Sequence, residues 1–126
     1  MRKLTISSIS ALVALAISAV ALVPAATARP DRQTRSAVTT IQVNAGEFFF
    51  RLSKKSIARP GKVTFAVKNA GHVVHDFKIN SRKTSLIQPG RTARLVVTFK
   101  KKGSYRYLCT VDSHASLGMK GTFTVR

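Results

Sequence analysis

Apolar and polar residues alternate in short stretches from residue 38 to the end of the chain. In residues 62–68, Val63, Phe65 and Val67 fall on one face of an extended strand, because strand side chains point to opposite faces with a period of two. Turns rich in glycine, proline and asparagine separate this stretch from others of the same kind. The pattern predicts strands at residues 39–44, 47–52, 62–68, 73–79, 92–100, 104–109 and 121–125.

The same region lacks the 3.6-residue apolar period of a long amphipathic helix. Many short strands separated by turns, in a domain of about one hundred residues, are typical of a two-layer sandwich. We therefore predict an all-β fold, an antiparallel Greek-key β-sandwich of about seven or eight strands.

The N-terminal segment has a different composition from the rest of the chain. Met1-Arg2-Lys3 is followed by a long run of apolar and small residues and then by the small-x-small sequence Ala26-Thr27-Ala28. This order predicts a signal peptide, and export to the periplasm or the cell exterior. The apolar run also approaches the length that spans a bilayer, so an uncleaved anchor remains the alternative. The predicted organisation is a signal peptide over residues 1–28, a flexible basic leader over 29–37 and a single domain over 38–126.

The chain is strongly basic, with 22 lysines and arginines against four acidic residues and a formal net charge of +18. Such a charge attracts any negatively charged body, whether nucleic acid, an anionic surface or an acidic protein. The sequence lacks the basic stripe rich in exposed aromatic residues that stacks on nucleic-acid bases. We therefore expect no specific nucleic-acid partner.

Three side chains that bind metals well follow one another in the turn between the last two predicted strands. Cys109, His114 and Met119 stand at intervals of five residues, and Cys109 is the only cysteine of the chain. Strand parity places His75 on the inward face of residues 73–79, together with Phe77, so a second imidazole points toward the core.

Two imidazoles, one thiolate and one thioether form a ligand set that favours copper. A trigonal plane of two histidines and a cysteine with a weak axial methionine defines the blue electron-transfer site, whereas structural zinc normally takes further cysteines or histidines. The alternative interpretation is a metal-free sandwich with a buried, inert Cys109. That interpretation requires four independent coincidences of residue type and position.

Residues 69–77 and 107–121, which contain these side chains, resemble the two copper motifs of the cupredoxins, the family of plastocyanin, azurin and pseudoazurin. The resemblance implies a cupredoxin-like sandwich that binds one type 1 copper ion. It further implies that the strong equatorial ligands are His75, Cys109 and His114, and that the axial ligand is Met119.

The chain departs from the motifs of the familiar members at two places. Asp112-Ser113 stands where many members have Pro-Gly, and Asp76 follows the first histidine where plastocyanin and azurin have asparagine. We expect Asp76 to accept hydrogen bonds from Thr110 and so to join the two ligand segments, since outer hydrogen bonds orient metal ligands. His72 has the opposite strand parity to His75, and we assign it no ligand role.

The resemblance implies a blue copper protein that shuttles single electrons, and the predicted signal peptide makes it a secreted one. The site has no evident open position for a substrate and no general acid or base beside it, so we do not expect an enzyme. By analogy, electrons pass at the edge of His114, within an apolar patch made with Ala115, Leu117 and Val73. The basic charge then favours an acidic redox partner. We expect a monomer with no membrane attachment after signal cleavage. A copper carrier that uses the same ligands is the main alternative, and a basic sandwich that binds an anionic surface is a weaker one.

Overall fold

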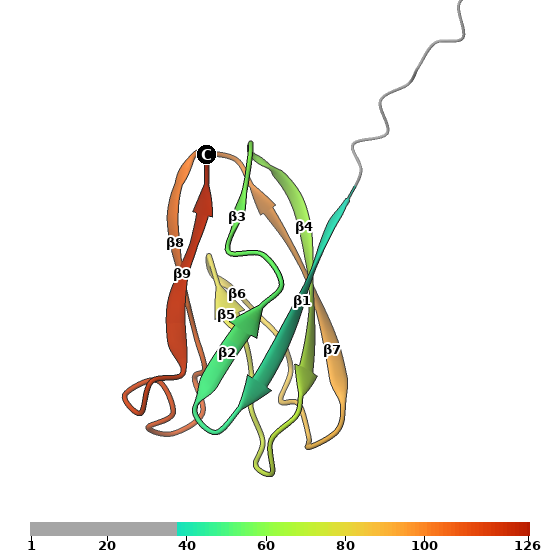
Figure 1. The fold of residues 1–126 in the computed structure, drawn as a ribbon, viewed down its shortest axis with the longest axis vertical. Coiled ribbons are helices and arrows are strands. Elements are labelled where there is room, and N and C mark those ends of the chain that lie inside the picture. Colours follow the sequence, from blue (N-terminus) through green and yellow to red (C-terminus); the bar gives the residue numbers. More distant parts are fainter. Residues whose placement is uncertain (1–37) are drawn as a thin grey trace, which may run out of the picture. The chain divides into compact units, whose positions relative to one another are not determined.

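The computed structural model describes residues 38–126, which form nine strands in two layers (Figure 1). The expected signal peptide over residues 1–28 and the leader over 29–37 lie outside the described residues. Within the described part, the structure contains no helix that is long and apolar enough to cross a bilayer. The predicted all-β sandwich is confirmed.

One sheet has four strands in the order β2-β1-β4-β7, and the other has five in the order β3-β9-β8-β5-β6. Each sheet is mixed, and not wholly antiparallel as expected, because β1 pairs with β4 in parallel and β3 pairs with β9 in parallel. The first parallel pair arises because the chain crosses to the other sheet through β3 before it begins β4. The strands are β1 (Thr39–Gly46), β2 (Phe49–Leu52), β3 (Ser56–Ile57), β4 (Gly61–Asn69), β5 (Lys78–Ile79), β6 (Arg82–Lys83), β7 (Thr92–Phe99), β8 (Gly103–Leu108) and β9 (Lys120–Val125).

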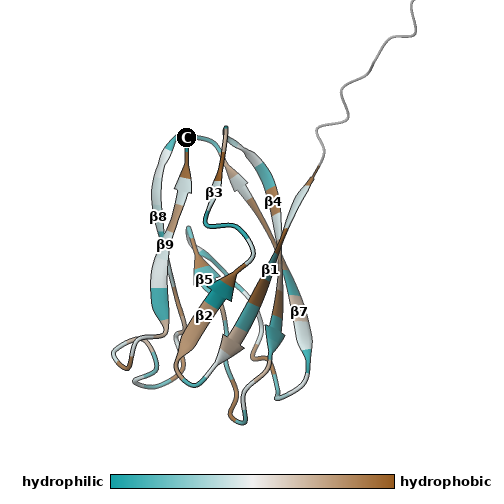
Figure 2. Cartoon of the chain, viewed as in Figure 1, coloured by the Kyte–Doolittle hydropathy of each residue, from teal (hydrophilic) through white to brown (hydrophobic). Residues whose placement is uncertain are grey.

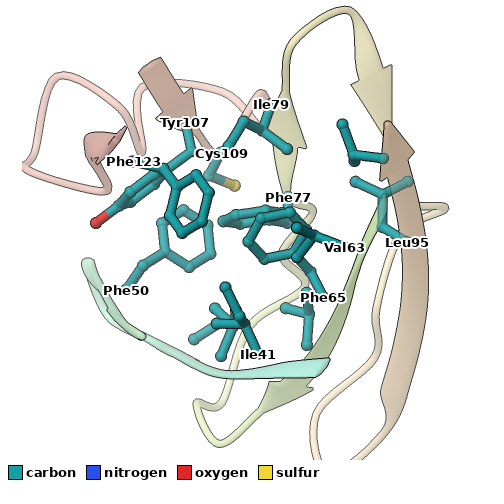
Figure 3. Close-up of a cluster of buried hydrophobic side chains, with 14 of the residues drawn as sticks. Ile41, Phe50, Val63, Phe65, Phe77, Ile79, Leu95, Tyr107, Cys109 and Phe123 are labelled. Atoms are coloured by element: carbon teal, nitrogen blue, oxygen red, sulfur yellow. The ribbon is translucent and has the colours of Figure 1, made fainter. Parts of the chain in front are cut away.

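Alternation along the long strands forms the core between the two sheets. In β4, Val63, Phe65 and Val67 are fully buried, while Lys62 and Lys68 on either side of them are exposed. Figure 2 shows the resulting alternation of hydrophobic and hydrophilic positions along the strands. Aromatic rings fill the centre of the core, and Figure 3 draws them together with Cys109. The rings that contact Phe65 are Phe77, Phe99 and Phe123, with centroid distances of 5.3, 6.4 and 5.5 Å.

The predicted strand over residues 73–79 is only partly present. Its last two residues form β5, whereas His75 makes an isolated bridge to Ile87 outside any strand. β5 instead turns into β6 through Asn80 and Ser81, which both have positive φ. A two-residue hairpin of this kind requires positive φ at both turn positions, and asparagine tolerates it well. The structure therefore adds a short hairpin that the alternating pattern did not predict.

The turns that follow β1, β4 and β8 meet at one end of the sandwich (Figure 1). Ala70 donates its backbone N–H to the carbonyl of Ala45, and the ring of Phe48 lies against that of His114, with centroids 4.8 Å apart. β1 runs toward this end and β9 runs away from it, so the described domain begins and finishes at the opposite end.

Candidate metal centre

The loop between β8 and β9 is closed by hydrogen bonds at its base. The pairing of Leu108 with Lys120 ends the strand ladder, and Cys109 then donates its N–H to the carbonyl of Met119 at 3.0 Å. Met119 donates to the carbonyl of His114, also at 3.0 Å. The backbone of this one loop therefore joins its cysteine, histidine and methionine, and all three side chains are buried.

His75 lies in a different segment, between β4 and β5, and the backbone of that segment is also fixed. Its backbone exchanges two hydrogen bonds with Ile87, with His75 N donating at 3.2 Å and Ile87 N donating at 2.7 Å. The His75 side chain has no exposed surface, as the inward parity predicted.

Asn69, at the end of β4, organises the start of this segment from within the core. Its buried side-chain amide donates to the carbonyls of Val73 and Ile87, at 2.8 and 2.7 Å, and its carbonyl accepts from Gly71 N at 2.9 Å. From the sequence, Asn69-Ala70-Gly71 was expected to break the chain between strands and to begin the first copper motif, with no role for the Asn69 side chain. The structure shows that Asn69 also ties together the backbone that carries His75.

Three donor atoms converge where the two segments meet. His114 Nδ1 lies 3.2 Å from His75 Nδ1 and 3.6 Å from Cys109 Sγ, and one ligand atom from each residue lies within 4.8 Å of the others. Ligands at about 2.0–2.3 Å from a metal, separated by angles of about 105–120°, stand about 3.2–3.9 Å apart. The closest separations therefore fit a single ion held by two imidazoles and a thiolate.

Burial shifts the pKa values of His75 and Cys109 from their ordinary values. Loss of solvation lowers the pKa of His75, so its imidazole is neutral at neutral pH and has a lone pair for a metal. Loss of solvation also raises the pKa of the Cys109 thiol, although backbone N–H groups of Asp76 and Val111 oppose the increase. A metal ion deprotonates a coordinating thiol outright, so a metal held here would take Cys109 as the thiolate.

Met119 is completely buried, and its backbone forms one side of the base of the loop. A thioether in this position is soft and carries no charge, which suits a weak ligand to copper and does not suit a hard cation. Its assignment as the axial ligand remains a prediction.

Asp76 links the two ligand segments, as expected. Its carboxylate accepts from Thr110 N at 2.6 Å and from the Thr110 hydroxyl, and Lys83 Nζ lies 3.6 Å from the same carboxylate. Because Asp76 is 1% exposed, these partners compensate a charge that water cannot reach. Each ligand segment thus holds the other in position.

The turn between β1 and β2 is a part of the site that sequence analysis missed. Glu47 Oε1 accepts hydrogen bonds from the backbone N–H groups of His72 at 2.6 Å and Val73 at 3.0 Å, and it lies 3.3 Å from His75 Nε2. The two backbone N–H groups lower the pKa of Glu47 from 4.5 to about 2. The next residue, Phe48, covers the His114 ring. The sequence did contain a signal that could have pointed to Glu47. It is one of only four acidic residues in a very basic chain, and it precedes three consecutive phenylalanines.

The surface around His114 is apolar in part. His114 is 9% exposed, whereas Val73 and Leu117 are 43% and 57% exposed. Ala115 is half-buried, and the side chain of His72 is 96% exposed. His72 therefore points to solvent, as its parity predicted, and contributes no donor to the buried group.

Comparisons with known proteins agree with this geometry. The family described as copper binding proteins, plastocyanin/azurin family, matches residues 35–126, and a search of curated proteins finds no match. A dithionite-reduced auracyanin from Roseiflexus castenholzii is 23% identical with a TM-score of 0.61, over 71% of this chain and 98% of that one.

Two further solved structures have the same fold. Auracyanin A, described as a "blue" copper protein from Chloroflexus aurantiacus, is 22% identical with a TM-score of 0.59, over 70% of this chain and 98% of that one. Auracyanin B is 19% identical with a TM-score of 0.58, over 70% and 88%. At these identities the structural likeness supports the sandwich fold alone.

Proposed function

Because the chain belongs to the plastocyanin/azurin family of copper-binding proteins, we propose that it is a type 1 copper protein that carries single electrons between redox partners. The observation that carries the proposal is the buried convergence of His75, Cys109 and His114 at one end of the sandwich. We propose these three as the equatorial ligands and Met119 as the weak axial ligand. Copper held there supplies a one-electron couple.

The chain's own contribution is a rigid ligand frame. The backbone of His75 is bonded to Ile87, and the loop that carries the other ligands is bonded across its base. The Asp76–Thr110 contact then ties the two segments together. Ligands that are held this firmly move little when the charge of the site changes, and small movement favours fast electron transfer.

We propose that partners exchange electrons at the end of the sandwich where His114 lies. The exposed apolar side chains there, Val73 and Leu117, suit a transient contact that excludes water from the path. Exposed lysines and arginines over the rest of the surface would steer an acidic redox partner toward the protein. The rate of electron transfer with an acidic partner is then expected to fall as salt is added, because salt screens this attraction.

We also propose that the protein acts as an exported monomer and does not itself convert a substrate. The N-terminal sequence supports export, and cleavage after Ala28 would give a secreted protein that starts at Arg29. N-terminal sequencing of the exported protein tests this point. A start at Met1 would favour the membrane-anchored alternative.

The decisive experiment is copper reconstitution of the purified protein. Adding Cu(II) to the wild type should give intense visible absorption from the cysteine thiolate to copper, and Cys109→Ser should remove it. His72→Ala is the control for histidine loss, because this side chain lies in solvent, and it should keep the colour. A folded wild type without the absorption would contradict the proposal.

A second measurement separates an electron carrier from a copper carrier. The reconstituted protein should undergo repeated reduction and reoxidation with copper retained, as followed by the visible absorption and by metal analysis after gel filtration. Loss of copper to an acceptor on each reduction would favour delivery.

A further inference from the structure

We propose that Glu47 is a positioning residue for the metal centre, which orients the His75 imidazole and places a negative charge beside it. The inference deepens the function proposed above and rests on it. Glu47 lies in the turn between β1 and β2, far from both ligand segments in sequence, yet its carboxylate lies 3.3 Å from His75 Nε2.

The Glu47 carboxylate is held in place independently of His75. Oε1 accepts from the N–H groups of His72 and Val73, so the backbone of the first ligand segment fixes it. A Cβ at position 71 would collide with the Glu47 carboxylate, and the glycine found there leaves the room it needs. The side chain is 29% exposed, which leaves it only partly screened by water.

This contact determines which nitrogen of His75 is available to a metal. An ionised carboxylate only accepts hydrogen bonds, so a neutral His75 must carry its proton on Nε2 to bond with Glu47. The lone pair is then on Nδ1, the atom that lies 3.2 Å from His114 Nδ1. Glu47 contacts the far side of the ring and is therefore not itself one of the converging donors.

The charge of Glu47 has no strong cationic partner. Among the described residues, its ion-pair contacts are to His72 and His75, and no lysine or arginine lies within 4.0 Å, whereas Lys83 accompanies Asp76. A negative charge next to a ligand, with no lysine or arginine beside it, would stabilise Cu(II) more than Cu(I). A carboxylate bonded to a metal-binding histidine also raises the basicity of that ligand, which acts in the same direction.

Two substitutions separate orientation from charge. Glu47→Gln retains an oxygen that accepts the same hydrogen bonds and removes the charge, whereas Glu47→Ala removes both. Asp112→Asn is the matched control, because it removes one carboxylate charge from an exposed position of the ligand loop. Asp112 has a φ of 37°, which asparagine also tolerates.

The first measurement uses the metal-free protein, so it does not depend on copper chemistry. Nitrogen-15 NMR of the imidazoles should place the His75 proton on Nε2 in the wild type and in Glu47→Gln. The proton should be distributed over both nitrogens in Glu47→Ala. A wild-type His75 protonated on Nδ1, or a tautomer unchanged in Glu47→Ala, would overturn the orienting role.

The second measurement compares Cu(II) affinity and reduction potential. Loss of an outer partner of a metal-binding histidine costs about 10–100-fold in metal affinity, and we expect Glu47→Ala to weaken Cu(II) binding by this amount. The potential should become more positive in Glu47→Gln, with a smaller shift in Asp112→Asn. Equal potentials in wild type and Glu47→Gln would overturn the charge role. A wild type that is not blue would contradict the proposed function, while the NMR result would still decide the orientation of His75.

Discussion

Replacement of the buried Asn69 by alanine should strongly destabilise the metal-free protein. The substitution removes three hydrogen bonds, from the side chain to the carbonyls of Val73 and Ile87 and from Gly71 N to the side chain. Ile87 O would retain its bond from His75 N, whereas Val73 O and Gly71 N would each lose the side chain as their partner. The segment that carries His75 would therefore lose its anchor in the core.

The expected magnitude follows from these contacts. At about 1 kcal/mol net for each hydrogen bond, the three bonds together contribute about 3 kcal/mol. For a domain of this size, a loss of 1 kcal/mol lowers Tm by about 4–8 °C, so the total fall should be roughly 12–24 °C. An exposed polar residue on the adjacent strand, Asn44, provides the control, and Asn44→Ala should change stability by less than about 0.5 kcal/mol.

Urea unfolding of the metal-free variants, followed by circular dichroism, measures the loss directly. A shifted midpoint with an unchanged slope reports a change in stability alone. If Asn69→Ala lost less than about 0.5 kcal/mol, the same as its control, the anchoring role would be refuted.

The isosteric Asn69→Asp provides a second check. A carboxylate cannot donate to the two carbonyls, so this variant should be least stable at neutral pH. Its pKa should be raised in the folded state, because the protonated acid can donate one hydrogen bond again. Its stability should therefore recover as the pH falls below that value.

Three further outcomes are expected. Gly121→Ala places a Cβ against the Tyr107 ring, within 2.8 Å of Cε2, and should lower the free energy of unfolding by about 1–3 kcal/mol. Gly61→Ala is the control, because no atom lies within 4 Å of the added Cβ, and thermal unfolding should show a smaller loss. Phe65→Ala empties the centre of the aromatic core and should cost about 3–5 kcal/mol by urea unfolding; a cost below about 1 kcal/mol would contradict the packing described. The pKa of Glu47 is depressed from 4.5 to about 2, so its stabilisation is present above pH 4.5 and is lost as the pH falls toward 2. Acid titration of metal-free Glu47→Gln should show a shallower loss of stability over that window than the wild type does, and identical curves would contradict the assignment.

The parts of the fold that alternation predicts are those where one strand face is buried over several residues. The long strands β4 and β7 were predicted nearly to their ends, because each presents alternate side chains to the core. β3, β5 and β6 contain two residues each, too few to show a period. The inward direction of His75 was correct although most of its segment is not a strand, because its bridge to Ile87 preserves the same parity.

The site was predictable to the extent that residue chemistry is specific. A lone cysteine, a histidine and a methionine at equal spacing on one loop indicate a metal before any coordinates are known, and the structure brings Cys109 and His114 together with His75. Glu47 escaped prediction because its contact with His75 links residues from two different turns. A carboxylate in a turn has no periodic signature, and its role becomes visible only when β1 is paired with β4.

The directions of the first and last strands, β1 and β9, have a practical consequence for attaching the protein to a surface or to another protein. β1 starts, and β9 finishes, at the end of the sandwich away from His114. A fusion partner, a resin or an electrode linker joined before β1 or after β9 would therefore leave the His114 edge facing outward. Immobilisation through the C-terminal Arg126 should preserve exchange with a soluble partner, whereas coupling through a cysteine introduced at the exposed Leu117 should block it.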